Sequence, residues 1–282
     1  MASKIWQQFE LFIYSLQFTS VILYFLSLEK NIIWLRYLTK TTPVLLLLPL
    51  VHIVWRKQIG AKNTASLFLL TFYTIGILLS AIGDLLLVRD IWESSYTFGA
   101  SSFILGLLCY AVAFYPKKEG YQTRVFIQSF IIMTVISSCV FLIIFRGVYN
   151  SPVNIVTCFI YLLTQCIIVT SFVSQPNNSQ DRCEQCQSVG SCGAILFCLS
   201  DFMLIIDAGL KMIEQNNGRD GTIPGFPLRN YAVMLTYYAG QFMIAWCTRQ
   251  WSCAERNKVK EQIVVELKMS KQEHEKELRK SE

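Results

Sequence analysis

The stretch LLTFYTIGILLSAIGDLLLV (69–88) decides the fold of this chain. It is mostly apolar, carries one charged residue, Asp84, and is long enough to cross a hydrocarbon layer as a helix. Its apolar residues run continuously, whereas the strands of a membrane β-barrel alternate apolar and polar residues. The stretch therefore predicts a membrane-spanning α-helix with an acid inside it.

The rest of the sequence repeats this pattern. Hydrophobic residues make up 53% of the 282 residues and charged residues 16%, against roughly 25% charged in a soluble domain. We predict an all-α polytopic membrane protein, with a transmembrane bundle over 1–250 and a charged C-terminal tail over 251–282. About eight helices are expected, at 9–28, 37–55, 65–88, 98–115, 126–146, 153–174, 193–214 and 230–250.

The charges indicate a topology and exclude one class of partner. The net charge of +6 comes mostly from the tail, and no nucleic-acid-reading motif is present, so nucleic acid is not expected as a partner. Lys and Arg favour a cytoplasmic amino end, and this preference depends on the tail alone.

The acids inside the predicted helices carry the functional information. Asp84 and Asp201 both lie in apolar runs, where an Asp costs about 2.5–3.5 kcal/mol to insert and usually faces the bundle interior. The segments GDLLLVRD (83–90) and SDFMLIID (200–207) resemble each other, and both lie on the third helix of a predicted four-helix half. A four-plus-four repeat is therefore possible, with both carboxylates at similar depth.

Other polar groups are candidates for the same site. They share a position within or beside an apolar run: Lys40, Ser80, Tyr110, Ser200, Tyr237, Tyr238 and Gln241. Lys40 could keep a carboxylate ionised, or only extend to the membrane surface. The tyrosines could bind a headgroup, or only anchor helix ends at the interface. We expect no metal, because Cys183, Cys186 and Cys192 lack a nearby fourth ligand, and His52 is expected in the core.

Several motifs, in order, resemble those of the YhhN family of membrane proteins, which includes the lysoplasmalogenases. They are K-x-x-P (Lys40–Pro43), S-x-x-G-D (Ser80–Asp84), the pair Phe103 and Tyr110, F-x-x-S-D (Phe197–Asp201) and Y-Y-x-x-Q (Tyr237–Gln241). The resemblance implies an eight-helix enzyme that hydrolyses the vinyl ether bond of lysoplasmalogens to a fatty aldehyde and a glycerophospho-base. It implies Asp84 and Asp201 as the essential acids, a lysophospholipid substrate, no cofactor and the endoplasmic reticulum membrane. One departure is Leu107, where the family often has a histidine.

Two buried acids suit this chemistry. Cleaving a vinyl ether requires protonation of its β-carbon, and water then attacks the resulting oxocarbenium ion, so one carboxyl group must be neutral and another ionised. The sequence does not say which acid has which role. Two alternatives from other classes stay open: a transporter or lipid carrier that uses the acids as proton or cation sites, and a scaffold that presents the tail.

Overall fold

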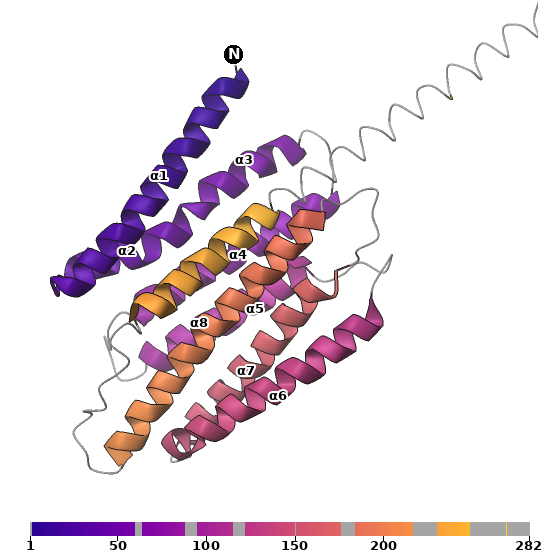
Figure 1. Cartoon of the computed structure of the whole chain (residues 1–282). Coiled ribbons are helices and arrows are strands. Elements are labelled where there is room, and N and C mark those ends of the chain that lie inside the picture. Colours follow the sequence, from indigo (N-terminus) through magenta and orange to yellow (C-terminus); the bar gives the residue numbers. More distant parts are fainter. Residues whose placement is uncertain are drawn as a thin grey trace, which may run out of the picture.

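The protein is a bundle of long helices. The computed structural model describes residues 2–59, 64–87, 95–114, 122–149, 151–175, 184–216, 230–248 and 269, and all regular structure in these ranges is helical. The labelled helices are α1 (Ala2–Glu29), α2 (Ile33–Leu45), α3 (Leu47–Ile59), α4 (Thr64–Leu86), α5 (Ser95–Phe114), α6 (Thr123–Val148), α7 (Pro152–Val173) and α8 (Glu184–Asn216). Residues 230–248 form a further helix, drawn in yellow-orange beside α8 (Figure 1).

The helices confirm an all-α, multi-pass membrane protein. Within the described residues, six helices are long and apolar enough to cross a membrane, and they lie in α1, α4, α5, α6, α7 and α8. The other two predicted crossings correspond to the pair α2–α3 and to the helix 230–248. The predicted tail, 251–282, lies outside the described residues apart from position 269.

The predicted second span, 37–55, is wrong as one continuous helix. The chain forms α2 and α3, which are separated at Leu46. Pro49 has no N–H to donate to the carbonyl of Leu45, so one continuous helix would lack that hydrogen bond. The chain therefore ends one helix at Leu45 and begins the next at Leu47, which places Pro49 in the first turn of α3.

Two further predictions about the chain need correction. The helix predicted at 193–214 is α8, and it begins at Glu184 instead. Residues 184–192 contain no proline that would interrupt a helix, so they extend α8 by more than two turns. His52 is exposed on α3 rather than packed in the core, and its neighbours Val51 and Ile53 point inward instead.

Small residues let the last helix lie close against α8. A Cβ added to Gly240 would lie 2.8 Å from the carbonyl oxygen of Gly193 and 2.9 Å from the backbone nitrogen of Phe197. A Cβ added to Gly193 would in turn lie 3.0 Å from the carbonyl oxygen of Gly240. These contacts involve backbone atoms, which cannot rotate away as side chains do, so the two glycines set the separation of the helices.

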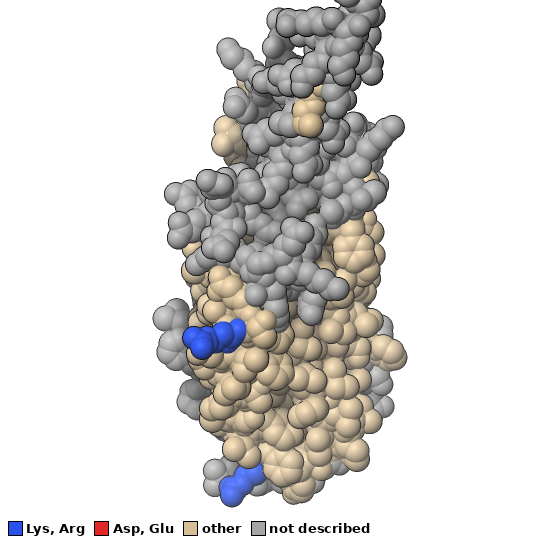
Figure 2. All heavy atoms as spheres, turned by 90° about the vertical axis from the view of Figure 1, so that its right-hand side faces the viewer, with Lys and Arg blue, Asp and Glu red and all other residues tan. Residues whose placement is uncertain are grey.

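The outer surface of the bundle is apolar, as lipid contact requires. Along α6, Ile132 is 59% exposed and Leu142 is 72% exposed. Figure 2 shows a face on which the described residues are mostly neutral, with little Lys or Arg and no Asp or Glu among them. The ionisable groups Asp84 and Asp201 are instead buried within the bundle.

Candidate functional site

Asp84 lies near the end of α4 and is buried, at 2% exposed. Tyr73, Gly76, Ser80 and Gly83, which lie on the same helix, are all buried as well. The ammonium group of Lys40 lies 3.4 Å from Oδ1 of Asp84, and the hydroxyl of Tyr237 donates to Oδ2 at 2.7 Å. This carboxylate therefore has one cationic partner and one neutral donor.

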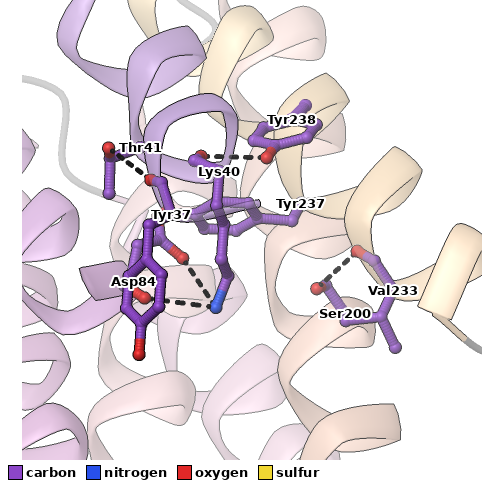
Figure 3. Close-up of polar contacts among 8 residues, drawn as sticks. All are labelled: Tyr37, Lys40, Thr41, Asp84, Ser200, Val233, Tyr237 and Tyr238. Carbon is purple, nitrogen blue, oxygen red and sulfur yellow. Dashed lines mark hydrogen bonds and ion pairs between the residues drawn. The ribbon is translucent and has the colours of Figure 1, made fainter. Parts of the chain in front are cut away.

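Lys40 reaches this acid from α2, which packs against α4. Its Nζ also donates to the main-chain oxygen of Asp84 at 3.4 Å, and Figure 3 shows the side chain extended toward both oxygens. The main-chain oxygen of Lys40 accepts a hydrogen bond from Tyr238 at 2.9 Å. Because Lys40 is 12% exposed and points at an acid, its cation is held inside the bundle rather than at the membrane surface.

Asp201 lies in the middle part of α8 and is 4% exposed. Tyr161 donates to its Oδ2 at 2.8 Å, and the amide nitrogen of Gln165 donates to the same oxygen. Oδ1 accepts no hydrogen bond from the described residues, and none of them places a cation beside this carboxyl group. Both partners of Asp201 are therefore neutral.

Tyr237 links the surroundings of the two acids. Its hydroxyl group bonds to Asp84, while its ring lies 5.3 Å from the ring of Phe197, which is one turn before Asp201 on α8. The ring of Phe103 on α5 lies 6.2 Å from it on another side. All three rings belong to one buried apolar cluster, so the space around the acids is low in water.

The remaining predicted residues lie in the same interior. Tyr110 donates to the Oε1 atom of Gln241 at 3.1 Å, and the Nε2 atom of Gln241 is buried without a hydrogen-bond partner among the described residues. Ser200 donates to the main-chain oxygen of Val233 at 2.9 Å, which fastens α8 to the last helix (Figure 3). Ser80 is buried on α4, with its Oγ atom directly against Gly106 of α5.

Tyr161 and Gln165 were not predicted from the sequence as partners of an acid. They lie four positions apart on α7, the same spacing as Tyr237 and Gln241 on the last helix. That repeated Y-x-x-x-Q pattern is the signal that would have found them, because residues at i and i+4 share a helix face. Each acid also takes a partner from the span before its own helix: Lys40 on α2 for Asp84, and Tyr161 on α7 for Asp201.

Two positions bear on the remaining predictions. Leu107, at the family's histidine position, is 1% exposed and belongs to the apolar core, so it offers no titratable group there. No group of three or more His, Cys, Asp or Glu residues that could hold a metal ion is found within the described residues. Cys183 and the side chain of Cys186 lie outside them.

Comparison with known proteins identifies one family. The sequence model of the YhhN family matches residues 35–248, a range that contains both acids and all their described partners. No curated protein matches the chain, and no solved structure matches it.

Proposed function

The chain belongs to the YhhN family, and we propose that it hydrolyses the vinyl ether bond of lysoplasmalogens to a fatty aldehyde and a glycerophospho-base. The observation that carries this proposal is the difference between its two buried acids. Asp84 faces the ammonium group of Lys40 at 3.4 Å, whereas Asp201 has only the neutral donors Tyr161 and Gln165. One ionised and one neutral carboxyl group are what this reaction requires.

The different partners of the two acids support a different role for each. A buried charge is costly unless it is paired, so the acid beside a cation is ionised and the acid among neutral groups is protonated. Asp201 is therefore the general acid, and Asp84 is the carboxylate. Because Oδ2 of Asp201 accepts both of its hydrogen bonds, the proton to be transferred resides on Oδ1.

The reaction then proceeds with balanced proton transfers. The Asp201 proton is added to the β-carbon of the vinyl ether, and the electron pair of the double bond forms the new C–H bond. The α-carbon becomes part of an oxocarbenium ion, which the negative charge of Asp84 stabilises. Water adds to this carbon and loses a proton, which restores Asp201. The resulting hemiacetal transfers its hydroxyl proton to the glycerol oxygen, and the C–O bond breaks to release the aldehyde.

The other candidate residues bind and orient the lysophospholipid. The Nε2 atom of Gln241 is a buried donor without a partner among the described residues, so it is available to an oxygen of the substrate. Tyr110 holds the other end of that amide. Tyr238, Ser80 and Ser200 line the same interior. The apolar helices support a location in a lipid bilayer, and we propose the endoplasmic reticulum membrane.

The test is aldehyde release by purified protein. The variants Asp84→Asn and Asp201→Asn keep the size of each side chain and remove its acid, and each is expected to lose the activity. Asp201→Asn should unfold at a temperature close to that of the wild type. Asp84→Asn leaves the ammonium group of Lys40 without its counter-ion and should unfold earlier, so it is assayed below its own unfolding temperature. Full activity in either variant would falsify the paired-acid mechanism. A lipid carrier using the same acids would bind the alkenyl lysophospholipid without cleaving it. A scaffold would instead lose its function on deletion of 251–282.

A further inference from the structure

A groove between α6 and α7 opens toward the lipid. Its volume is about 360 Å³, within the range of small-molecule sites, which runs from about 300 to 1,000 Å³. Leu142 on α6 and Phe159 on α7 form part of its outer rim, at 72% and 59% exposed. Leu162 and Cys166 are buried and lie at its floor. The groove therefore runs from the outer surface into the bundle.

The polar groups in this groove are already bonded. Thr134 donates to the main-chain oxygen of Phe130 at 2.7 Å, and Ser138 donates to that of Thr134 at 2.8 Å. The Ser137 hydroxyl and the Cys166 thiol share one hydrogen bond of 3.2 Å, in which either group can donate. None of the residues lining the groove is charged. A ligand here needs no hydrogen-bonding groups, and a hydrocarbon chain fits that requirement.

The floor of the groove and the partners of Asp201 belong to the same stretch of α7. Leu162 and Cys166 follow directly after Tyr161 and Gln165 on α7, so one pair lines the groove while the other pair holds the carboxyl group. Helices α6 and α7 are both long and apolar enough to cross a membrane, so we expect the groove to lie within the hydrocarbon layer. A hydrocarbon chain is the occupant that suits an uncharged groove at such a position.

We propose that the groove between α6 and α7 binds the hydrocarbon chain of the lysophospholipid substrate. This inference rests on the proposed function and deepens it, because it names where the chain lies while Asp201 acts on the ether bond. Two other occupants would contradict the proposal: ordinary membrane phospholipid in the groove, or a second copy of the protein packed against it.

The first experiment measures binding and needs no cleavage. The full chain is placed in phosphatidylcholine nanodiscs with a non-cleavable alkyl-ether lysophospholipid that carries a diazirine at the far end of its chain. After illumination, we expect the label on peptides from α6 and α7. An excess of the unlabelled analogue should displace it, and additional phosphatidylcholine should not.

Matched substitutions test the position. Thr134→Trp and Ser138→Trp place an indole in the groove and are expected to lower this labelling about tenfold. Val135→Trp and Cys139→Trp lie one position further along α6, outside the groove lining, and should leave it unchanged. Label spread evenly over other helices, label displaced by phosphatidylcholine, or cross-links between two copies would each overturn the proposal.

The second experiment separates this inference from the proposed function. In the aldehyde assay, Ser138→Trp should raise the KM for a long-chain alkenyl lysophospholipid about tenfold and leave kcat unchanged. If labelling is as expected and no substrate is cleaved, the groove stands and the proposed function fails. If substrate is cleaved and all four tryptophan variants behave alike in both assays, the groove proposal fails and the function stands.

Discussion

The surroundings of Asp84 and those of Asp201 differ in how the chain assembles them. Asp84 takes its side-chain partners from α2 and from the last helix, 44 and 153 positions away. Asp201 takes both of its partners from α7, 40 and 36 positions away. The first site thus joins distant parts of the chain around an ion pair, whereas the second is formed by two neighbouring helices with neutral groups only.

This difference shows how a helical bundle can favour different protonation states for two buried carboxyl groups. Burying the ammonium group costs free energy, because it must be paired and hydrogen-bonded. Lys40 satisfies this requirement with two oxygens of Asp84. Asp201 needs no cation if it keeps its proton, and a tyrosine and an amide suffice to hold it.

Removing the acid at Asp201 is expected to have the largest effect. General acid catalysis by a positioned side chain contributes about 10²–10⁴-fold, so Asp201→Asn should slow single-turnover aldehyde release by about that factor. Asp207→Asn is the control, because Asp207 lies on the same helix and pairs with Lys211 near the surface. A rate for Asp201→Asn equal to that of Asp207→Asn would remove Asp201 from the chemistry.

Removing the cation at the other site tests the ion pair. Lys40→Met leaves a buried carboxylate without its counter-ion, so thermal or denaturant unfolding in detergent should show a loss of about 3–5 kcal/mol. Adding Asp84→Asn removes the orphaned charge and should restore most of that stability without restoring activity. The comparison breaks if the double variant is no more stable than Lys40→Met alone.

The two tyrosines compare a charged acceptor with a neutral one. Tyr237→Phe loses a hydrogen bond to a charged group, and the expected loss is about 1.5–3 kcal/mol. Tyr161→Phe loses a bond to a neutral carboxyl group, and about 0.5–1.5 kcal/mol is expected. Unfolding in detergent measures both. Equal losses would indicate that the two acids have the same charge.

The smallest effect is expected at the surface. Lys211 pairs with Asp207 at 3.1 Å, four positions apart on α8, with its side chain 58% exposed. Lys211→Met should change the free energy of unfolding by only about 0.2–0.5 kcal/mol. A loss as large as that of Lys40→Met would show that burial does not explain the difference between the two pairs.

The sequence predicted the helices better than their interruptions. The buried acids and their helix faces follow from apolar runs that each contain an Asp, because both the cost of burial and helical periodicity can be read from residue types. The break at Leu46 depends on where Pro43 and Pro49 fall within the turns, and apolar content alone does not reveal it. The early start of α8 was hidden because the residues before 193 are polar.

The partners of the acids were only partly predictable. Lys40 and Tyr237 stood out as polar residues within or beside apolar runs, and both contact Asp84. Tyr161 and Gln165 lie in an equally apolar run, but a neutral residue in a helix does not indicate which acid it will face. That pairing depends on the packing of α7 against α8, and helix packing is a tertiary feature.

The close contact between Gly193 and Gly240 also affects Tyr237, which is adjacent to neither glycine in the sequence. Tyr237 precedes Gly240 by less than one turn, so the distance its hydroxyl must cover to Asp84 depends on how tightly its helix is seated. A single methyl group at either glycine would press against main-chain atoms, so the two helices would have to separate. Gly193 and Gly240 thus control the reach of Tyr237 to Asp84, and a substitution at either is expected to weaken that hydrogen bond although no polar side chain has changed.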